Sequence, residues 1–354
     1  MYYHGLGVRK DTLEASKWHT FAADKNNSDA QCQLGILRER GEGLTQDTLE
    51  AIRLYNEAAK QKSPHAIFKL AQKYEDGSGG ENNFELALRL FGIAAHLGSL
   101  DAQLKLAKIY GDNKKQWYDT KTSFKHYQMA SDQGSPEAKY KLAIMYLDGQ
   151  GTRLGIEQDY TKAMHYFTVA ANQGHAAAQS QLGFFYEKGH GTDQDWTKAR
   201  EWYTKAADQS DSVASYYLSN IYYYGMGVEI NYKLAFQYYE IAANQGYVDA
   251  QTQLGFLYEN GHGTDQDWTK TREWYTKAAD QNNSVASYYL GNIYYRGRGV
   301  EVNYKVAFQY YETAANRGDV NAQRQLGFLY ENGHGTDQDW AKAREWYTKA
   351  ADQN

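Results

Sequence analysis

Cysteine and proline are scarce in this sequence. Among 354 residues there is one cysteine, Cys32, and there are two prolines, Pro64 and Pro136. A lone cysteine excludes an intrachain disulfide and a cysteine-based zinc site. It also favours a reducing compartment, so we expect a cytoplasmic protein. Because proline interrupts helices, its scarcity indicates a mostly helical chain.

Long apolar segments are also missing. No stretch approaches the roughly 20 apolar residues that a membrane-spanning helix requires, so we expect no membrane span. The first residues, MYYHGLGVRKD, carry no apolar run of signal-peptide length. Their segment 2–7 aligns instead with 222–227, which ends the first helix of a repeat described below. A truncated gene model would explain this start within a repeat, and a targeting signal would then be lost.

Clustered positive charge is absent. The formal net charge is −5 at pH 7, and the isoelectric point is near 6.1. Proteins that bind nucleic acid group lysine and arginine against the phosphate backbone. We therefore expect no nucleic-acid partner.

Motifs of the common catalytic sites are missing as well. We find no S-x-x-K, G-x-S-x-G or H-E-x-x-H segment. Several Gly-x-Gly pairs occur, but no predicted strand precedes them, so they are not dinucleotide-binding or phosphate-binding loops. We expect no enzymatic activity and no cofactor.

The C-terminal half contains a tandem repeat. Residues 181–252 and 253–324 form two blocks of 72 residues with 57 identities, and 325–340 begin a third round. A weaker period of 36 residues appears within each block. Self-similarity at about 20 to 50 residues is typical of solenoids, whose units stack along one axis. We expect a single solenoid domain over 1–354, with a partial repeat at 1–29, diverged repeats at 30–177 and recently duplicated repeats at 178–354.

The first half of each 36-residue unit predicts a helix. A leucine recurs nine times between Leu34 and Leu326, and a tyrosine follows it by four residues in all units but the first. Positions four and eight residues apart share a helix face, so the small opening residue, the leucine and the tyrosine should form a buried stripe. Glycines such as Gly183 should let two helices approach to about 8 Å.

The second half of each unit predicts another helix. A Gly-x-Gly pair ends the first helix, because glycine readily takes the left-handed conformation of a C-cap. In one unit Asn113 and Lys115 replace the glycines, and we expect Asn113 to serve as the cap. An Asp or Asn follows in every unit, where its side chain should cap the second helix. The sequence therefore predicts an all-α chain of antiparallel helix pairs with nineteen helices.

These features together resemble the Sel-one-like repeat family, a relative of tetratricopeptide repeats. The shared pattern is A-x-x-x-L-G-x-x-Y, Gly-x-Gly, Asx and W/Y-Y-x-x-A-A-x-x-G, which recurs over nearly the whole chain. The resemblance implies a right-handed α-solenoid that acts as a scaffold or adaptor for other proteins or extended peptides. The alternative is that the chain is the targeting or regulatory arm of a larger enzyme. A kinase, a ubiquitin-ligase complex or a polysaccharide-synthase complex would fit that alternative.

The resemblance also implies where partners bind. In tetratricopeptide-like repeats the first helix of each unit lines the concave surface, which here predicts alternating Tyr-Asn-Tyr and Phe-Glu stripes. Tyrosine and asparagine lose little side-chain entropy and hydrogen-bond readily, which suits an extended peptide. The alternative is that these aromatic residues mainly pack against neighbouring repeats. The predicted groove residues are Tyr216, Asn220, Tyr223, Phe256, Glu259, Tyr288, Asn292, Tyr295, Arg296, Arg324, Phe328 and Glu331.

Differences between the two 72-residue copies give a second indication. The copies differ at 15 positions, and the second is more positive by four charges. It gains Arg296, Arg298, Arg317 and Arg324, several of which border the predicted groove. This would suit an acidic partner segment. Neutral drift after the duplication explains the same substitutions, and the sequence does not decide between the two.

Three histidines, His190, His262 and His334, occupy identical GHG loops two repeats apart. Such loops should lie roughly 20 Å from each other, whereas zinc ligands lie about 2 Å from the metal. We therefore expect no metal site and interpret these residues as exposed loop histidines. Asp195 follows in a run that lacks the glycine and glutamate of a calcium loop, and we interpret it as a helix cap.

The two ends of the chain suggest a further possibility. Neither end carries a polar capping helix, and uncapped solenoid ends expose apolar surface. End-to-end self-association would cover that surface, although truncation explains the same observation.

Overall fold

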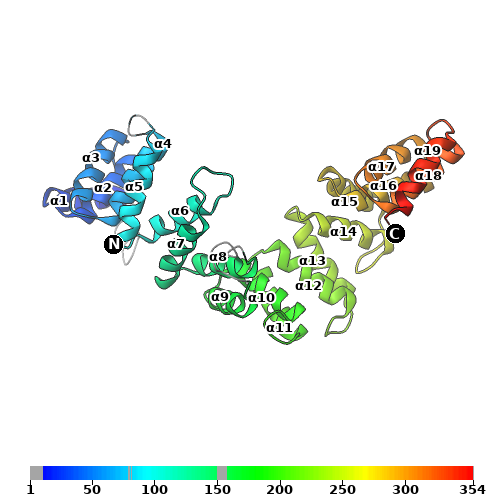
Figure 1. The fold of residues 1–354 in the computed structure, drawn as a ribbon, viewed down its shortest axis with the longest axis horizontal. Coiled ribbons are helices and arrows are strands. Elements are labelled where there is room, and N and C mark those ends of the chain that lie inside the picture. The colour runs from blue at the N-terminus through cyan, green and yellow to red at the C-terminus, as the bar shows by residue number, and fades with distance from the viewer. Residues whose placement is uncertain (1–10, 79, 81, 150–157, 354) are drawn as a thin grey trace. The chain divides into compact units, whose positions relative to one another are not determined.

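The computed structural model describes residues 11–78, 80, 82–149 and 158–353 (Figure 1). These residues form helices and connecting turns, and none of them belongs to a strand. The chain divides into two compact units, Met1–Gln173 and Gly174–Asn354. Each unit is an α-solenoid built from helix pairs.

Nineteen helices occur in the described part of the chain, which confirms the predicted number. Even-numbered helices are the first helices of a repeat, and odd-numbered helices are the second. The first unit contains α1 (Thr12–Asp24), α2 (Ser28–Arg40), α3 (Thr48–Lys60), α4 (Pro64–Asp76), α5 (Phe84–His96), α6 (Leu100–Gly111), α7 (Thr120–Asp132), α8 (Pro136–Leu147) and α9 (Tyr160–Asn172). The second unit contains α10 (Ala176–Lys188), α11 (Trp196–Ala207), α12 (Ser212–Tyr224), α13 (Tyr232–Asn244), α14 (Val248–Asn260), α15 (Trp268–Asp280), α16 (Ser284–Arg296), α17 (Tyr304–Asn316), α18 (Val320–Asn332) and α19 (Trp340–Ala351).

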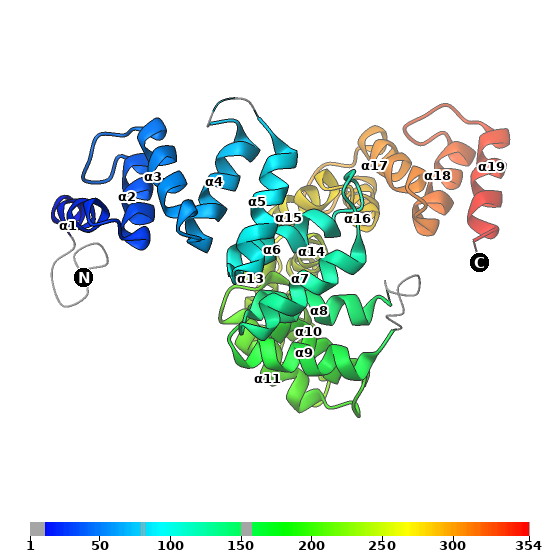
Figure 2. The same ribbon diagram turned by 60° about the vertical axis from the view of Figure 1, so that its left-hand side comes forward.

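Consecutive helices pack against one another along each unit. A first helix contacts the second helix of its own repeat and the second helix of the preceding repeat in the same unit. Neighbouring first helices also touch, as α2 and α4 do in the first unit and α10 and α12 do in the second. The stacking of α2, α3, α4 and α5 can be followed in Figure 2.

The core of each repeat combines small residues with one large ring. Alanines of both helices and the leucine row of the first helix are buried, as predicted. The ring belongs to the second helix, where a tyrosine or phenylalanine is buried in eight repeats. A Cβ atom at Gly255 would lie 2.6 Å from the ring of Tyr275, so the glycine makes room for the tyrosine. The eight buried rings are Tyr55, Phe91, Tyr127, Phe167, Tyr203, Tyr239, Tyr275 and Tyr311.

The tyrosine row of the first helices is less buried than predicted. Tyr258 and Tyr330 are buried, but the other six are half-buried. Tyr222, for example, stacks on Tyr238 of the next helix with ring centroids 6.1 Å apart. The fully buried position belongs instead to the next residue, Tyr239, while Tyr238 is half-buried.

The helix ends largely follow the predicted capping pattern. All ten second helices begin after an Asp or Asn whose side chain accepts a hydrogen bond from a first-turn amide. Most first helices end at a left-handed glycine, such as Gly261 with φ of 69°. Helix α6 differs, because it ends at Gly111 and its C-cap Asp112 is extended. Asn113 does not take a left-handed conformation, so the prediction that it replaces the capping glycine is wrong.

The second glycine of the Gly-x-Gly pair allows one repeat to touch the one before it. Gly263 has a φ of +76°, and a Cβ atom there would lie 2.2 Å from the carbonyl oxygen of Tyr232. Tyr232 begins α13, the second helix of the preceding repeat. Gly43 and Gly335 approach the preceding second helix in the same way. The loop of each of these repeats therefore packs directly on its neighbour.

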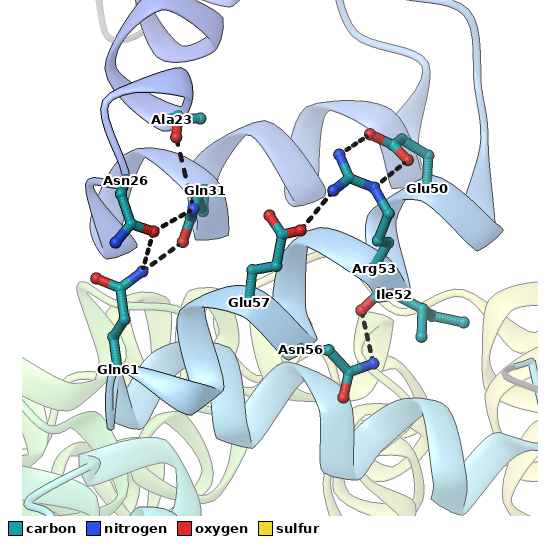
Figure 3. A network of polar contacts seen from close by, with 9 residues as sticks. All are labelled: Ala23, Asn26, Gln31, Glu50, Ile52, Arg53, Asn56, Glu57 and Gln61. Carbon is teal, nitrogen blue, oxygen red and sulfur yellow. Dashed lines mark hydrogen bonds and ion pairs between the residues drawn. The ribbon is translucent and has the colours of Figure 1, made fainter.

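Paired glutamines link the helices in alternate repeats. Gln61 at the C-terminus of α3 donates through Nε2 to Oε1 of Gln31 on α2 at 2.8 Å. Gln31 in turn donates to the carbonyl oxygen of Ala23 on α1 at 3.5 Å (Figure 3). Three consecutive helices are thus joined by polar contacts. The same pairing recurs as Gln103–Gln133, Gln179–Gln209, Gln251–Gln281 and Gln323–Gln353.

Replacing Gly263 by alanine should destabilise the second unit more than replacing Gly246. Both glycines have positive φ, where alanine costs roughly 1 to 2 kcal/mol, but nothing lies within 4 Å of a Cβ atom at Gly246. The clash at Gly263 should add about 1 to 3 kcal/mol. Denaturant unfolding followed by circular dichroism measures both losses. Equal losses would contradict a structural role for the close approach.

Candidate functional site

The predicted groove residues all lie on first helices of the second unit. They are carried by α12, α14, α16 and α18. Arg296, Arg324 and Phe328 are exposed, and the other nine are half-buried. Contacts between neighbouring first helices join parts of the row, since the rings of Tyr295 and Phe328 lie 6.4 Å apart. The binding role of the row stays a prediction.

The asparagines and glutamates of the row accept hydrogen bonds from tyrosines of the second helices, of which Tyr239, Tyr275 and Tyr311 are buried and Tyr347 is exposed. Tyr311 donates to Asn292 at 2.8 Å, and Tyr275 donates to Glu259 at 3.0 Å. Burial and the nearby Glu259 carboxylate raise the pKa of Tyr275 far above its usual value, so its hydroxyl stays a donor. The same bond joins Tyr239 to Asn220 and Tyr347 to Glu331. These polar groups are therefore engaged inside the repeat.

Two tyrosines of the row take part in aromatic clusters with a loop histidine. Tyr223 lies 3.0 Å from Nδ1 of His262, and the ring of Tyr232 stacks on the imidazole at 4.7 Å. In the second copy Tyr295 lies 3.2 Å from Nδ1 of His334. His262 and His334 are half-buried, so their interpretation as exposed loop residues is wrong. In both copies the histidine follows its tyrosine by 39 residues, but this spacing alone does not show that the two side chains meet.

The remaining tyrosines of the row, Tyr216 and Tyr288, have different surroundings. Tyr216 contacts Tyr247 with ring centroids 4.9 Å apart. In the second copy Asp319 stands where Tyr247 stands in the first, so Tyr288 lacks that aromatic neighbour. Tyr216 and Tyr288, which occupy equivalent positions in the two copies, thus have different aromatic neighbours. The alternative interpretation, packing against neighbouring repeats, applies more to Tyr216 than to Tyr288.

Only some of the added arginines leave their charge at the surface. Arg298 forms an ion pair with Glu259 at 2.6 Å and lies over the ring of Trp268 at 5.4 Å. Arg317 donates a hydrogen bond to the side chain of Asn282. Arg296 and Arg324 are exposed, and neither makes an ion pair with a described residue. The positive character of the row therefore depends mainly on these two side chains.

Residues 11–78, 80, 82–149 and 158–353 hold no group of three or more His, Cys, Asp or Glu positioned for a metal ion. No helix within these ranges is long and apolar enough to cross a membrane.

Comparison with protein families assigns the chain. The sequence profile of the Sel1 repeat matches ten consecutive segments of the chain, at 1–27, 28–63, 64–99, 100–135, 136–175, 176–211, 212–247, 248–283, 284–319 and 320–354. The chain belongs to the Sel1 repeat family. This confirms the resemblance inferred from the repeat pattern, and the Sel1 repeat is about 36 residues long here.

Solved structures with this Sel1 repeat fold cover most of the chain. A protective antigen of uropathogenic Escherichia coli strains that displays an SLR fold is 27% identical, with a TM-score of 0.70, over 99% of this chain and 82% of that one. A Sel1 repeat protein from Oxalobacter formigenes is 30% identical, with a TM-score of 0.65, over 86% of each chain. These likenesses confirm the all-α solenoid. No curated protein sequence matches this chain significantly.

Replacing Asn292 by alanine should destabilise the protein through the buried Tyr311 hydroxyl. An unsatisfied buried hydroxyl costs about 1 to 3 kcal/mol. The additional change Tyr311→Phe removes the hydroxyl, so the double variant should recover part of that loss. Denaturant unfolding of the two single variants and the double variant measures the coupling. Additive losses would show that the Asn292–Tyr311 hydrogen bond contributes nothing.

Proposed function

We propose that this Sel1 repeat protein is a scaffold that holds an extended acidic segment of a partner protein on the first helices of its second unit. Sel1 repeat solenoids are typical of proteins that bind other proteins. The observation that supports this proposal is a cluster of two aromatic and two cationic side chains. Tyr295, Arg296, Arg324 and Phe328 form it, and we call it the α16–α18 surface.

The α16–α18 surface extends across two repeats. The rings of Tyr295 and Phe328 meet edge to face and join α16 to α18. Arg324 and Phe328 are four residues apart on α18, so they share one face of that helix. Arg296 follows Tyr295 at the end of α16. A bound segment would therefore meet apolar rings with guanidinium groups beside them.

The charges of this surface favour an acidic ligand. Arg296 and Arg324 are exposed and make no ion pair within the described part of the chain. A guanidinium group binds a carboxylate through two parallel hydrogen bonds. An acidic segment would supply those carboxylates, and apolar residues between them would pack on the rings of Tyr295 and Phe328.

The corresponding surface of the first copy is less suited to this role. Tyr224 stands in place of Arg296, and Thr252 stands in place of Arg324. The second copy therefore offers more positive charge, which suits an acidic ligand.

Selection from a displayed library of random peptides tests the proposal with the full chain. We expect enrichment of extended peptides that combine acidic and apolar residues, with affinities that fall as salt is added. The double charge reversal Arg296→Glu and Arg324→Glu should weaken the selected peptides at least about tenfold.

A matched variant controls for the change of net charge. Lys233→Glu and Lys305→Glu alter the charge equally, but these exposed lysines lie on the second helices α13 and α17. This control should bind the selected peptides as the unmodified chain does, with the same helical circular dichroism. Equal binding by the Arg296→Glu and Arg324→Glu variant would refute the α16–α18 surface.

Several expectations from the sequence stay predictions beside this proposal. They are the non-enzymatic character, the single domain, the lack of a nucleic-acid partner, end-to-end self-association, the cytoplasmic location and the alternative of an enzyme's targeting arm.

A further inference from the structure

Three successive repeats of the first unit bring the same three positions together. The first position ends a first helix, the second is the buried ring of the following helix, and the third is a lysine of the next first helix. Each position recurs with a spacing of 36 residues. The three sets are Glu39, Tyr55 and Lys69, then Glu75, Phe91 and Lys105, then Gly111, Tyr127 and Lys141.

In the first two sets a glutamate carboxylate occupies the meeting point. Tyr55 donates to Glu39 at 2.7 Å, and the ammonium that pairs with this carboxylate, at 2.5 Å, belongs to Lys73, one helical turn after Lys69. Burial alone would raise the pKa of Glu39, but the hydrogen bonds from Lys73 and Tyr55 outweigh it and lower the pKa. In the second set Lys105 lies 2.8 Å from Glu75. The carboxylate is therefore an anion held by the groups around it.

The third set has the surrounding groups but not the carboxylate. Gly111 has no side chain, and a cavity of about 450 Å³ lies beside it, lined by Tyr127 and Lys141 among others. The side chain of Tyr127 is only 6% exposed. Within the described ranges no hydrogen bond of its hydroxyl and no ion pair of Lys141 are found, and the Lys141 ammonium lies 5.4 Å from the centroid of the Tyr140 ring. The cavity thus holds a donor at the position of Tyr55, which binds Glu39, and a cation at the position of Lys105, which binds Glu75.

The other polar groups of the cavity already have partners. Lys108 pairs with Glu137 at 3.7 Å, and Asp112 accepts a hydrogen bond from the backbone amide of Lys114 at 3.1 Å. Ser123 donates to the carbonyl oxygen of Ala107 at 2.7 Å. The charges of Lys108 and Glu137 largely offset each other.

Tyr127 is suited to donate at neutral pH. Burial, together with the negative charge of Glu137, raises the pKa of Tyr127 to about 12. Its hydroxyl therefore keeps its proton in any physiological solution. The Tyr127 side chain is mostly buried, but its hydroxyl is accessible from the cavity, so it can donate to an acceptor that enters there.

We propose that the cavity beside Gly111 binds a carboxylate group of a ligand, which takes the place that Glu39 and Glu75 fill in the two preceding repeats. The Tyr127 hydroxyl donates to it, and the Lys141 ammonium pairs with its charge. The carboxylate is borne either by an acidic side chain of a bound protein or by a small free acid. The cavity is large enough for either, since small-molecule sites commonly measure about 300 to 1,000 Å³.

Calorimetric titration of the full chain tests this site with three probes. N-acetylglutamate N-methylamide represents a protein side chain, glutarate represents a small acid, and N-acetylglutamine N-methylamide is the uncharged analogue. We expect at least one carboxylate probe to bind with a dissociation constant on the order of 1 mM, and the uncharged analogue to bind at least tenfold more weakly. Whichever carboxylate probe binds more tightly identifies the source. Failure of both carboxylate probes, or equal binding of the uncharged analogue, would overturn the proposal.

Substitutions assign the binding to the two named groups. Lys141→Met and Tyr127→Phe should each weaken the carboxylate probe by about tenfold. Phenylalanine is tolerated at this position, because Phe91 and Phe167 occupy it in the neighbouring repeats. Lys105→Met is the matched control, since Lys105 already pairs with Glu75. Unchanged binding by both Lys141→Met and Tyr127→Phe would contradict the site.

A glutamate introduced at Gly111 should act as a built-in ligand. Gly111→Glu should abolish probe binding and raise the midpoint of thermal unfolding above that of Gly111→Gln, which has similar helix propensity. A Cβ atom there would lie 3.0 Å from Oγ of Ser123, so the hydroxyl must shift slightly in both variants.

The pH dependence separates the carboxylate from the added side-chain volume. Pairing with Lys141 should lower the folded-state pKa of the new glutamate below its unfolded value of about 4.3. Its advantage over Gly111→Gln should therefore be complete above that pH and disappear as the pH falls through the folded-state pKa. Equal midpoints for the two variants at neutral pH would show that the cavity does not stabilise a carboxylate.

Discussion

The contact between a small residue of one helix and a tyrosine ring of the next governs the geometry of these repeats. Where glycine supplies the small residue, as at Gly255, a methyl group would collide with the ring of Tyr275. The ring carries a hydroxyl group into the interior, and a buried hydroxyl requires a partner. The end of the first helix supplies one as Asn or Glu. The Asn and Glu positions that were predicted to bind a partner therefore also contribute to folding.

This requirement divides the predicted groove residues into two kinds. Asn220 and Glu259 are engaged by the tyrosines beneath them, whereas Arg296, Arg324 and Phe328 are exposed. Because a buried tyrosine hydroxyl requires an acceptor, a repeat that lacks the Asn or Glu is informative. In the repeat that ends its first helix at Gly111, the tyrosine and the lysine are retained while the acceptor is missing. Internal comparison of repeats thus shows what chemical group a site lacks.

Much of the fold could be predicted because it depends on patterns within one helix. The leucine row, the Asp and Asn caps and the capping glycines such as Gly261 are local features, and the structure confirms them. Predictions failed where a residue's environment depends on another repeat. His262 lies against Tyr223, and Gly263 lies against the backbone of Tyr232. Both looked like ordinary loop residues in the sequence. The contacts of the predicted groove residues could not be predicted either, because they also depend on other helices.

Periodicity along the chain was sufficient to predict the number of helices and the buried leucine row, because a helix face repeats every three to four residues whatever surrounds it. The repeated motifs carried the resemblance to the family. The partners of the polar side chains were decided only by the tertiary structure. Tyr311 meets Asn292 across 19 residues, and Gln61 meets Gln31 across 30. Such pairs form because stacked helices place distant residues within hydrogen-bond distance. The helical period carries no information about which distant residue lies opposite. Which side chains are engaged inside the fold, and which stay exposed, was therefore decided only by these pairs.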